Sequence, residues 1–431
     1  MQSKRQLSRR SFFKRTGAGM AFVFPAIVPA SALGSGKKNA PSERITMGII
    51  GTGGRGTANM NSFLMQRDTQ VLAVCDVDKA HRDEAKALVD RRNRNNDCQA
   101  YNDFREITRR NDIDAVVIST PDHWHVLPAI DAAKNGKDIY VEKPLTLTIQ
   151  EGRVLSDAVK KHDRILQTGS QQRSMETFWK AAMLARNGRL GNIHAINVSI
   201  GDNNRECGPT WEPEPVPEGF DYNFWLGPAP WAEYHHLRCH YTFRFILDYA
   251  GGQVTNWGAH HLDIAQWSLD MDASGPIEVS GNGEFPPTGL FTTATNAYFE
   301  CTYANDVNLY CVTKGGPPLQ IEGSEGSVRA SRKAIASEPA SLLEEDFDSL
   351  ETQLYKSKDH VRNFLDCVKT REQPTCPAEV GHRSATVCHL GNIAMRLGRT
   401  VKWDPETETF GSDDEANAMI GRPLRDPWVL G

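Results

Sequence analysis

The stretch Ile45-Thr-Met-Gly-Ile-Ile50-Gly51-Thr-Gly53-Gly54-Arg55-Gly56 joins an apolar hexapeptide to a glycine-rich turn. The hexapeptide has the composition of a strand buried in a parallel sheet. A Gly-x-Gly-x-x-Gly turn between a strand and a helix lets the backbone approach a pyrophosphate, and the amino terminus of the helix stabilises its charge. A purely structural glycine turn is the alternative. The pattern predicts dinucleotide contacts at Gly51, Thr52, Gly53, Gly54, Arg55 and Gly56.

A carboxylate follows the last of these glycines by twenty residues, at the end of the next apolar run, Val71 to Cys75. Asp76 at this position is expected to accept hydrogen bonds from the adenosine ribose and to repel a 2′-phosphate. The predicted cofactor is therefore NAD in preference to NADP, although Arg55 could tolerate a phosphate.

Apolar runs then alternate with helix-compatible segments as far as residue 165. Polar segments with helical character, at 80–93, 127–135 and 149–162, precede, separate and follow the runs Ile113 to Ser119 and Ile139 to Val141. This alternation predicts an α/β fold with a doubly wound parallel sheet and right-handed crossovers.

The pattern changes near residue 166. A helix is expected at 175–186, and strands with alternating apolar residues at 193–200, 277–281, 295–303, 307–313 and 319–322. Such strands suit an antiparallel sheet with one covered face, and Ala304-Asn305-Asp306 suggests a hairpin. Helical patterns return at 361–369 and 379–397.

The amino terminus is predicted to be a targeting signal. Ser8-Arg9-Arg10-Ser11-Phe12-Phe13-Lys14 resembles a twin-arginine export signal, and Ala30-Ser-Ala32 offers a cleavage site. We therefore expect export to the periplasm by the twin-arginine machinery; a basic tail is the alternative. The predicted organisation is a signal peptide at 1–32, a linker at 33–43, an NAD-binding Rossmann domain at 44–165, and a substrate-binding and oligomerisation domain at 166–431.

Composition excludes other classes of partner. The chain of 431 residues carries a formal net charge of −5, and its first 32 residues hold six basic and no acidic side chains. The remainder is therefore more acidic than the whole, which argues against nucleic acid as a partner. No apolar run after residue 33 approaches the roughly 20 residues of a membrane span. The nine cysteines contain no Cys-x-x-Cys and indicate no disulfide framework.

Two further motifs follow predicted strands at the same sheet edge. They are Thr120-Pro121-Asp122-His123-Trp124-His125 and, after Asp138-Ile-Tyr-Val, Glu142-Lys143-Pro144. Ligands of doubly wound sheets bind at this edge. Cofactor contacts are expected from Thr120, Pro121, His123, His125, Glu142 and Lys143. His123-x-His125 lacks placed carboxylates, so no metal site is expected.

With these motifs the chain resembles the Gfo/Idh/MocA family of sugar and polyol oxidoreductases. The resemblance includes Gly251-Gly252-Gln-Val-Thr-Asn256-Trp-Gly-Ala-His260-His-Leu-Asp263 and reaches Arg425-Asp-Pro-Trp428, so it covers nearly all of the chain after the signal. It implies a Rossmann domain followed by an α/β domain with a large open, mainly antiparallel sheet. It also implies a homodimer or homotetramer.

The resemblance further implies catalysis by Lys143 and His260. The family's catalytic aspartate position holds Asn256 here, and an amide can orient a hydroxyl but cannot take a proton. His260 is then expected to be the stronger candidate for proton exchange. An exposed lysine, with a pKa near 10.4, is a poor base at neutral pH, but burial lowers that pKa. A continuous helix over 256–263 would place Asn256 and His260 on one face.

Substrate contacts are predicted at Lys143, Gln172, Arg173, Asn256, Trp257 and His260. The expected function is a periplasmic, NAD-dependent oxidoreductase that transfers hydride to or from a sugar or cyclitol carbon and holds its cofactor tightly. Two alternatives stay open. One is a redox-neutral, NAD-dependent glycoside-cleaving enzyme, and the other is a non-catalytic sugar-binding relative.

Overall fold

The computed structural model describes residues 43–202 and 211–431. The predicted signal peptide and nearly all of the predicted linker lie outside the described residues. Residues 45–431 cluster as one unit. Within the described part of the chain, no helix combines the length and apolar character that crossing a membrane requires.

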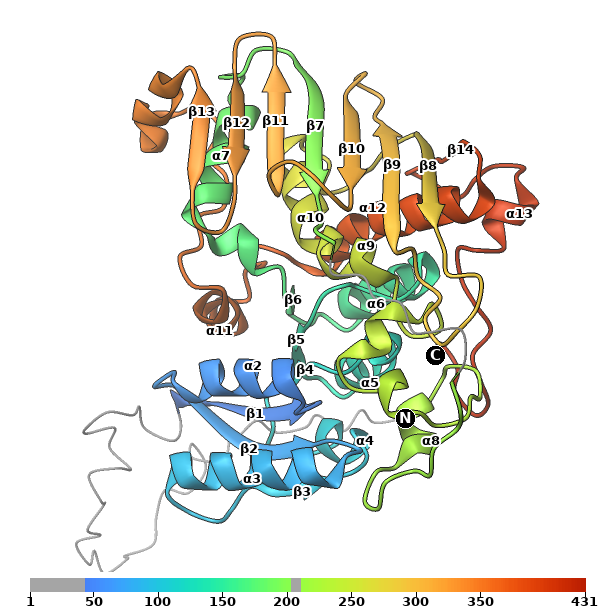
Figure 1. The fold of residues 1–431 in the computed structure, drawn as a ribbon. Helices are drawn as coiled ribbons and strands as arrows, with labels where there is room; N and C mark the ends of the chain where they lie inside the picture. Colours follow the sequence, from blue (N-terminus) through green and yellow to red (C-terminus); the bar gives the residue numbers. More distant parts are fainter. Residues whose placement is uncertain (1–42, 203–210) are drawn as a thin grey trace, which may run out of the picture. The chain divides into compact units, whose positions relative to one another are not determined.

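The amino-terminal part of this unit contains a parallel sheet of six strands in the order β3-β2-β1-β4-β5-β6 (Figure 1). The strands are β1 Ile45–Ile50, β2 Thr69–Cys75, β3 Gln99–Tyr101, β4 Ala115–Ile118, β5 Asp138–Val141 and β6 Leu166–Thr168. The order reverses at β1, which pairs with β2 on one side and with β4 on the other. At such a reversal the chain leaves neighbouring strand ends in opposite directions, and a crevice opens at the carboxyl edge.

Helices cover both faces of this sheet. They are α2 Gly54–Leu64, α3 Lys79–Asn93, α4 Arg105–Thr108, α5 Val126–Lys134 and α6 Ile149–Lys161. Because successive strand residues point to opposite faces, Ile49 packs in one core with Phe63 of α2. Ile50 packs in the other core with Ile130 of α5. Both faces are therefore buried, as the continuous apolar runs predicted.

The second sheet has eight strands in the order β13-β12-β11-β7-β10-β9-β8-β14. They are β7 Ile193–Ser199, β8 Glu278–Glu284, β9 Asn296–Thr302, β10 Asn308–Val312, β11 Leu319–Gly323, β12 Ser327–Ala330, β13 Ile335–Glu338 and β14 Val401–Lys402. Neighbouring strands are antiparallel except β7 and β10. The predicted β9–β10 hairpin is present, closed by a bond from the Tyr303 amide to the Val307 carbonyl. The predicted fold class is confirmed.

The remaining helices are α7 Glu176–Arg186, α8 Tyr222–Leu226, α9 Gly252–Asn256, α10 Gly258–Ser268, α11 His360–Thr370, α12 Ala378–Leu397 and α13 Asp414–Asn417. Short 3-10 turns occur at η3 Asp122–Trp124, η4 Gln171–Ser174, η5 His236–Arg238, η6 Thr242–Phe245, η7 Ala340–Glu344 and η8 Phe347–Ser349. Helices α7, α10 and α12 lie against one face of the second sheet (Figure 1). There Leu262 and Leu390 pack with Phe299 of β9.

The condition of a continuous helix over 256–263 is not met. Helix α9 ends at Asn256 and α10 begins at Gly258. In an unbroken helix the Asn256 carbonyl would accept from the His260 amide, but that amide bonds to the Trp257 carbonyl at 3.0 Å instead. The released Asn256 carbonyl accepts from Lys143 Nζ at 2.8 Å. The helix therefore breaks where its backbone serves the site.

Candidate functional site

A cavity of about 540 Å³ opens at the carboxyl edge of the parallel sheet. Its walls come from the strand ends of the first sheet, from α9 and α10, and from the segment that contains η6. Predicted residues that line it are Gly51, Gly53, Gly54, Arg55, Asp76, Thr120, Pro121, His125, Glu142, Lys143, Asn256, Trp257 and His260. Thus residues predicted separately to contact cofactor and substrate share one cavity.

The glycine turn has the shape of a cradle for an anion. Gly51 has φ +83°, and a Cβ there would lie 2.8 Å from the Ser119 backbone. A Cβ on Gly56 would lie 1.9 Å from the Gly51 carbonyl oxygen. By contrast, a Cβ on Gly54 would meet open space, and no side chain caps the amino terminus of α2. Free amide donors at a helix start fit a pyrophosphate, so these residues suit a dinucleotide.

Asp76 ends β2 with its carboxylate fixed beside this turn. One oxygen accepts from the Thr52 amide at 2.7 Å, and the other accepts from the Asp78 amide at 2.9 Å. The Thr52 hydroxyl also donates to Asp76, at 3.1 Å. Thr52 and Gly56 do not line the cavity; Thr52 instead orients the carboxylate predicted to bind the ribose.

His123, one of the predicted cofactor contacts, does not line the cavity. Its side chain is fully buried, and Nε2 lies 3.0 Å from the Trp225 carbonyl oxygen. Burial lowers the pKa of this imidazole to about 3. The η3 turn directs His123 into an aromatic cluster with Trp225 and Tyr249, away from the cavity, whereas its neighbour His125 reaches the wall.

Glu142 organises the floor of the cavity. Its Oε1 accepts from Arg55 Nε at 2.9 Å, from Asn59 Nδ2 at 2.9 Å and from Gln171 Nε2 at 3.0 Å. Burial alone would raise the pKa of this carboxyl, but Arg55 and Asn59 outweigh it and lower the pKa. Glu142 is therefore an ionised anchor, and its oxygen already holds three donors.

Lys143 projects from the end of β5 toward α9. Its Nζ donates to the Asn256 carbonyl oxygen at 2.8 Å and to Asn256 Oδ1 at 3.0 Å. Asn256 Nδ2 in turn donates to Gln253 at 3.1 Å, which fixes the orientation of the amide. Among residues 43–202 and 211–431, no carboxylate lies within ion-pair distance of Lys143 Nζ. Burial lowers the pKa of Lys143 to about 8, despite the opposing charges of Asp122 and Glu142.

His260 lies on the first turn of α10 and borders the same cavity. Burial, Lys143 and Arg332 together hold its pKa well below the usual value. Its Nδ1 is buried and has no hydrogen-bond partner among the described residues. A buried imidazole nitrogen without a partner costs free energy unless a ligand satisfies it. His260 is therefore a neutral imidazole that suits contact with a substrate hydroxyl.

Gln172 and Arg173, two of the predicted substrate contacts, do not line the cavity. Arg173 is 1 % exposed, and its Nε lies 2.9 and 3.0 Å from the two Asp263 oxygens. Asp272 supplies a second carboxylate, at 2.6 Å. Burial alone would lower the pKa of Arg173, but these carboxylates raise it well above its usual value. Arg173 is a structural cation.

Gln172 lies behind the site. With its amide oriented to satisfy both neighbours, it donates to the His260 carbonyl at 3.0 Å and accepts from Arg332 Nε at 3.2 Å. Arg332 was not predicted; it lines the cavity and its guanidinium lies 4.7 Å from the Trp257 ring centroid. Arg332 follows β12, a four-residue strand that no periodic signal revealed. Gln172 therefore positions two cavity residues without lining the cavity itself.

Comparison with known proteins agrees with this architecture. Residues 45–170 match the family model described as oxidoreductase family, NAD-binding Rossmann fold, and residues 206–430 match oxidoreductase family, C-terminal alpha/beta domain. The fold is similar to that of the WlbA dehydrogenase from Bordetella pertussis in complex with NADH and UDP-GlcNAcA. That likeness has a TM-score of 0.63 at 16 % identity, over 84 % of this chain and 99 % of the other.

A second similar structure is the aldose-aldose oxidoreductase from Caulobacter crescentus, with a TM-score of 0.61 at 19 % identity over 83 % of this chain and 99 % of that one. A curated relative is glycosyl hydrolase family 109 protein 1 of Shewanella sp. strain ANA-3, 33 % identical over 171 residues. The match covers 36 % of this chain and 37 % of the relative, so the chain spans about a third of its length. Since the two family models together span most of the chain, it belongs to the Gfo/Idh/MocA family of oxidoreductases.

Proposed function

We propose that this protein is an NAD-dependent oxidoreductase that transfers hydride to or from a hydroxyl- or keto-bearing carbon of a sugar or cyclitol. The observation that carries the proposal is Lys143, a desolvated amine that faces the cavity shared with the glycine turn and that, among the described residues, bonds only to Asn256. Bound NAD would supply the hydride acceptor or donor. The protein must then move the hydroxyl proton, and the position of Lys143 at the cavity supports this role for it.

The pKa of Lys143, about 8, suits proton transfer near neutral pH. During alcohol oxidation the neutral amine accepts the hydroxyl proton, and in the reverse direction the ammonium returns it. The sequence favoured His260 as the stronger proton-exchanging group. The lowered pKa of His260 supports a different division, in which the neutral imidazole orients the hydroxyl and Lys143 carries the proton.

Asn256 acquires a specific role from this arrangement. Its two oxygens fix the direction of the amine without adding negative charge. A carboxylate at the same distance would stabilise the ammonium form and raise the pKa of Lys143. The departure from the family's aspartate therefore favours a more readily deprotonated lysine, and it need not mark a degraded site.

A redox-neutral glycoside-cleaving enzyme is the second candidate. The curated relatives favour it, because they include glycosyl hydrolase family 109 proteins and the alpha-N-acetylgalactosaminidase of Shewanella oneidensis. In that reaction the same lysine would move protons while the substrate carbon is oxidised, the aglycone leaves and the hydride returns. A non-catalytic sugar-binding protein would need no desolvated amine at this position.

We further propose that the protein works in the periplasm with NAD, rather than NADP, held tightly. The support is the twin-arginine-like segment and Asp76, which would repel a 2′-phosphate. The periplasm offers no obvious pool for recycling free NAD, so a retained cofactor would be needed for repeated turnover. Replacing Arg9 and Arg10 by lysine should keep the protein in the cytoplasmic fraction; unchanged export would contradict this route. Light scattering of the purified protein tests the expected dimer or tetramer.

The central test starts with denaturation of the purified protein and identification of the released nucleotide by mass spectrometry. NAD is expected; absence of any nicotinamide nucleotide would favour the binding-protein alternative. The native protein is then incubated with sugars, cyclitols and glycosides. A product two mass units lighter or heavier than the substrate supports oxidoreduction. Release of an aglycone together with a sugar that is neither oxidised nor reduced supports glycoside cleavage.

A further inference from the structure

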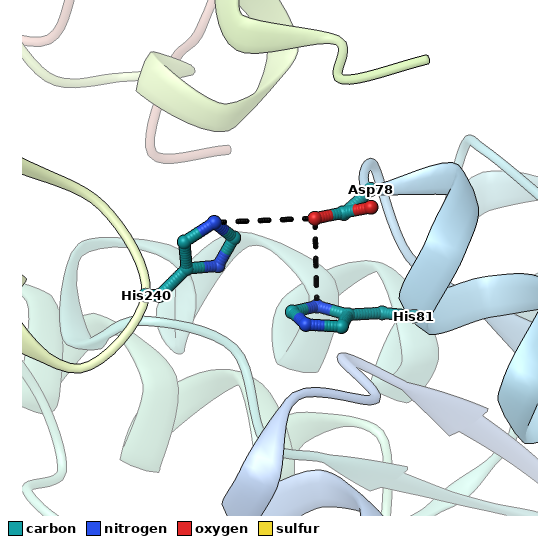
Figure 2. Close-up of side chains that lie close together, drawn as sticks. All are labelled: Asp78, His81 and His240. Carbon is teal, nitrogen blue, oxygen red and sulfur yellow. Dashed lines mark ion pairs between the residues drawn. The ribbon is translucent and has the colours of Figure 1, made fainter. Parts of the chain in front are cut away.

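Three side chains of types that ligate metals, two of which line the cavity, lie close together (Figure 2). Asp78 and His81 come from the junction of β2 with α3, where Asp78 is the amino-terminal cap of α3. His240 lies 159 positions after His81, between η5 and η6. Figure 2 shows the two imidazoles directed toward the same oxygen of Asp78.

The spacing of the three groups suits a shared ion better than direct hydrogen bonds. Asp78 Oδ2 lies 3.8 Å from His81 Nδ1 and 3.9 Å from His240 Nε2. These separations are too long for hydrogen bonds. Two ligands of a tetrahedral zinc ion, each about 2.0–2.1 Å from the metal, lie about 3.4 Å apart. All three donor atoms already lie within 4.8 Å of one another, so small side-chain rotations would complete the set.

Among residues 43–202 and 211–431, the atoms that face one another have no hydrogen-bond partner. Asp78 Oδ1 accepts from the Ala80 amide at 2.9 Å, which leaves Oδ2 for the imidazoles. The rings of His81 and His240 lie 5.2 Å apart at 77°, and His240 also packs 5.6 Å from the Phe220 ring. The side chains of Asp78, His81 and His240 are 20 %, 34 % and 45 % exposed. An ion can therefore reach the cluster, and water can occupy a fourth position.

The cluster joins two segments that already pair through their backbones. The Lys79 amide donates to the Gly219 carbonyl at 3.0 Å, and the Asp221 amide donates to the Val77 carbonyl at 3.0 Å. Asp78 forms an isolated bridge with Phe220 between these bonds. His81 and His240 both line the cavity that also contains Asp76. A metal here would fasten the segment that carries His240 over the ribose-binding end of that cavity.

We propose that Asp78, His81 and His240 bind one divalent transition-metal ion of the zinc class, and that this ion slows escape of the bound nucleotide. Two imidazoles and one carboxylate form a donor set that such ions accept, with an open position for water. The effect on the nucleotide rests on the proposed function, whereas the metal site does not. This site was not predicted from the sequence, because His240 lies far along the chain from Asp78 and His81.

A second cluster provides a matched control. Glu214, His235 and His236 also place donor atoms within 4.8 Å of one another. Here, however, Glu214 is already engaged, because its Oε2 accepts from the His236 amide at 2.9 Å and its Oε1 lies 2.9 Å from His236 Nδ1. The substitution His236→Gln therefore removes an imidazole of similar type without touching the proposed site.

The test uses the full chain without a polyhistidine tag, freed of metal by a chelator that is then removed. Zinc chloride is titrated by calorimetry into the wild-type protein and into His81→Gln, His240→Gln and His236→Gln. One saturating equivalent is expected for the wild type and for His236→Gln. Either substitution at the proposed site should weaken binding at least about tenfold. Circular dichroism and thermal melting verify that all four proteins fold.

No saturable zinc binding by the wild type would overturn the metal site, as would equal affinity in His81→Gln or loss of binding in His236→Gln. These measurements need neither nucleotide nor substrate, so they decide the metal site even if the proposed function fails. For the second part, release of bound nucleotide is followed after rapid dilution, with and without chelator. Faster release with chelator in the wild type, but not in His240→Gln, is expected; equal rates in the wild type would overturn the link to the nucleotide.

Discussion

Lys143, which is half-buried, and Arg173, which is fully buried, are two cations that the sequence placed together as substrate contacts, and the structure separates them. Arg173 bonds to Asp263 and Asp272 inside the second half of the unit. Within the part of the chain that the structure describes, Lys143 bonds only to the two oxygens of Asn256, at the cavity wall. Their pKa values accordingly move in opposite directions, well above the usual value for Arg173 and down to about 8 for Lys143. The difference teaches that the partner, more than burial, decides whether such a cation is structural or reactive.

The largest expected effect is on turnover when Lys143 is replaced by methionine. Removing the proton-transfer group should lower kcat by about 10²–10⁴-fold, while the nucleotide stays bound. Steady-state assays and nucleotide analysis of the purified variant measure both quantities. Lys137→Met is the matched control, because Lys137 Nζ also donates to two carbonyl oxygens but lies outside the cavity. Equal turnover in the Lys143 variant and this control would remove Lys143 from the mechanism.

Arg173→Met should act on stability. It leaves the fully buried Asp263 without its cation, which typically costs about 3–5 kcal/mol in the free energy of unfolding. Guanidinium unfolding followed by circular dichroism measures this loss. The control Arg186→Met breaks a pair with the exposed Asp270 and should cost less than about 1 kcal/mol. A similar small loss for both variants would contradict the structural role of Arg173.

Asn256→Asp should make Lys143 resemble Arg173 by giving it a carboxylate. The carboxylate stabilises the ammonium and raises the pKa of Lys143 above about 8. Since alcohol oxidation needs the neutral amine, the rising limb of the pH–rate profile should move to higher pH. A pKa increase of about one unit would reduce the rate at pH 7 about tenfold. An unchanged limb would show that the titrating group is not Lys143.

The smallest expected effect comes from Arg332, a third cation, which is exposed at the cavity. Its guanidinium stacks on Trp257, an interaction worth about 0.5–1 kcal/mol. Arg332→Met should therefore raise KM about two- to fivefold and leave kcat nearly unchanged. The adjacent exposed Lys333→Met serves as control. A large fall in kcat with constant KM would instead place Arg332 in the chemical step.

Much of the fold was predictable because its signals are local. The apolar run before Gly51 and the alternating strands before and after residue 305 identified both sheets. Strands β12 and β13 have four residues each and gave too short a pattern. The break between α9 and α10 was also missed, because it depends on a bond from Lys143 to the Asn256 carbonyl across 113 positions.

The sequence by itself determined the family resemblance, the position of the glycine cradle and the presence of Lys143 at a strand end, since these depend on residues close together in the chain. Only the tertiary structure decided that Lys143 faces an amide and Arg173 faces carboxylates. It also turned His123 into the core and brought His240 to Asp78. The physical reason is that charge state depends on desolvation and on partners within a few ångströms, and folding supplies these from distant segments.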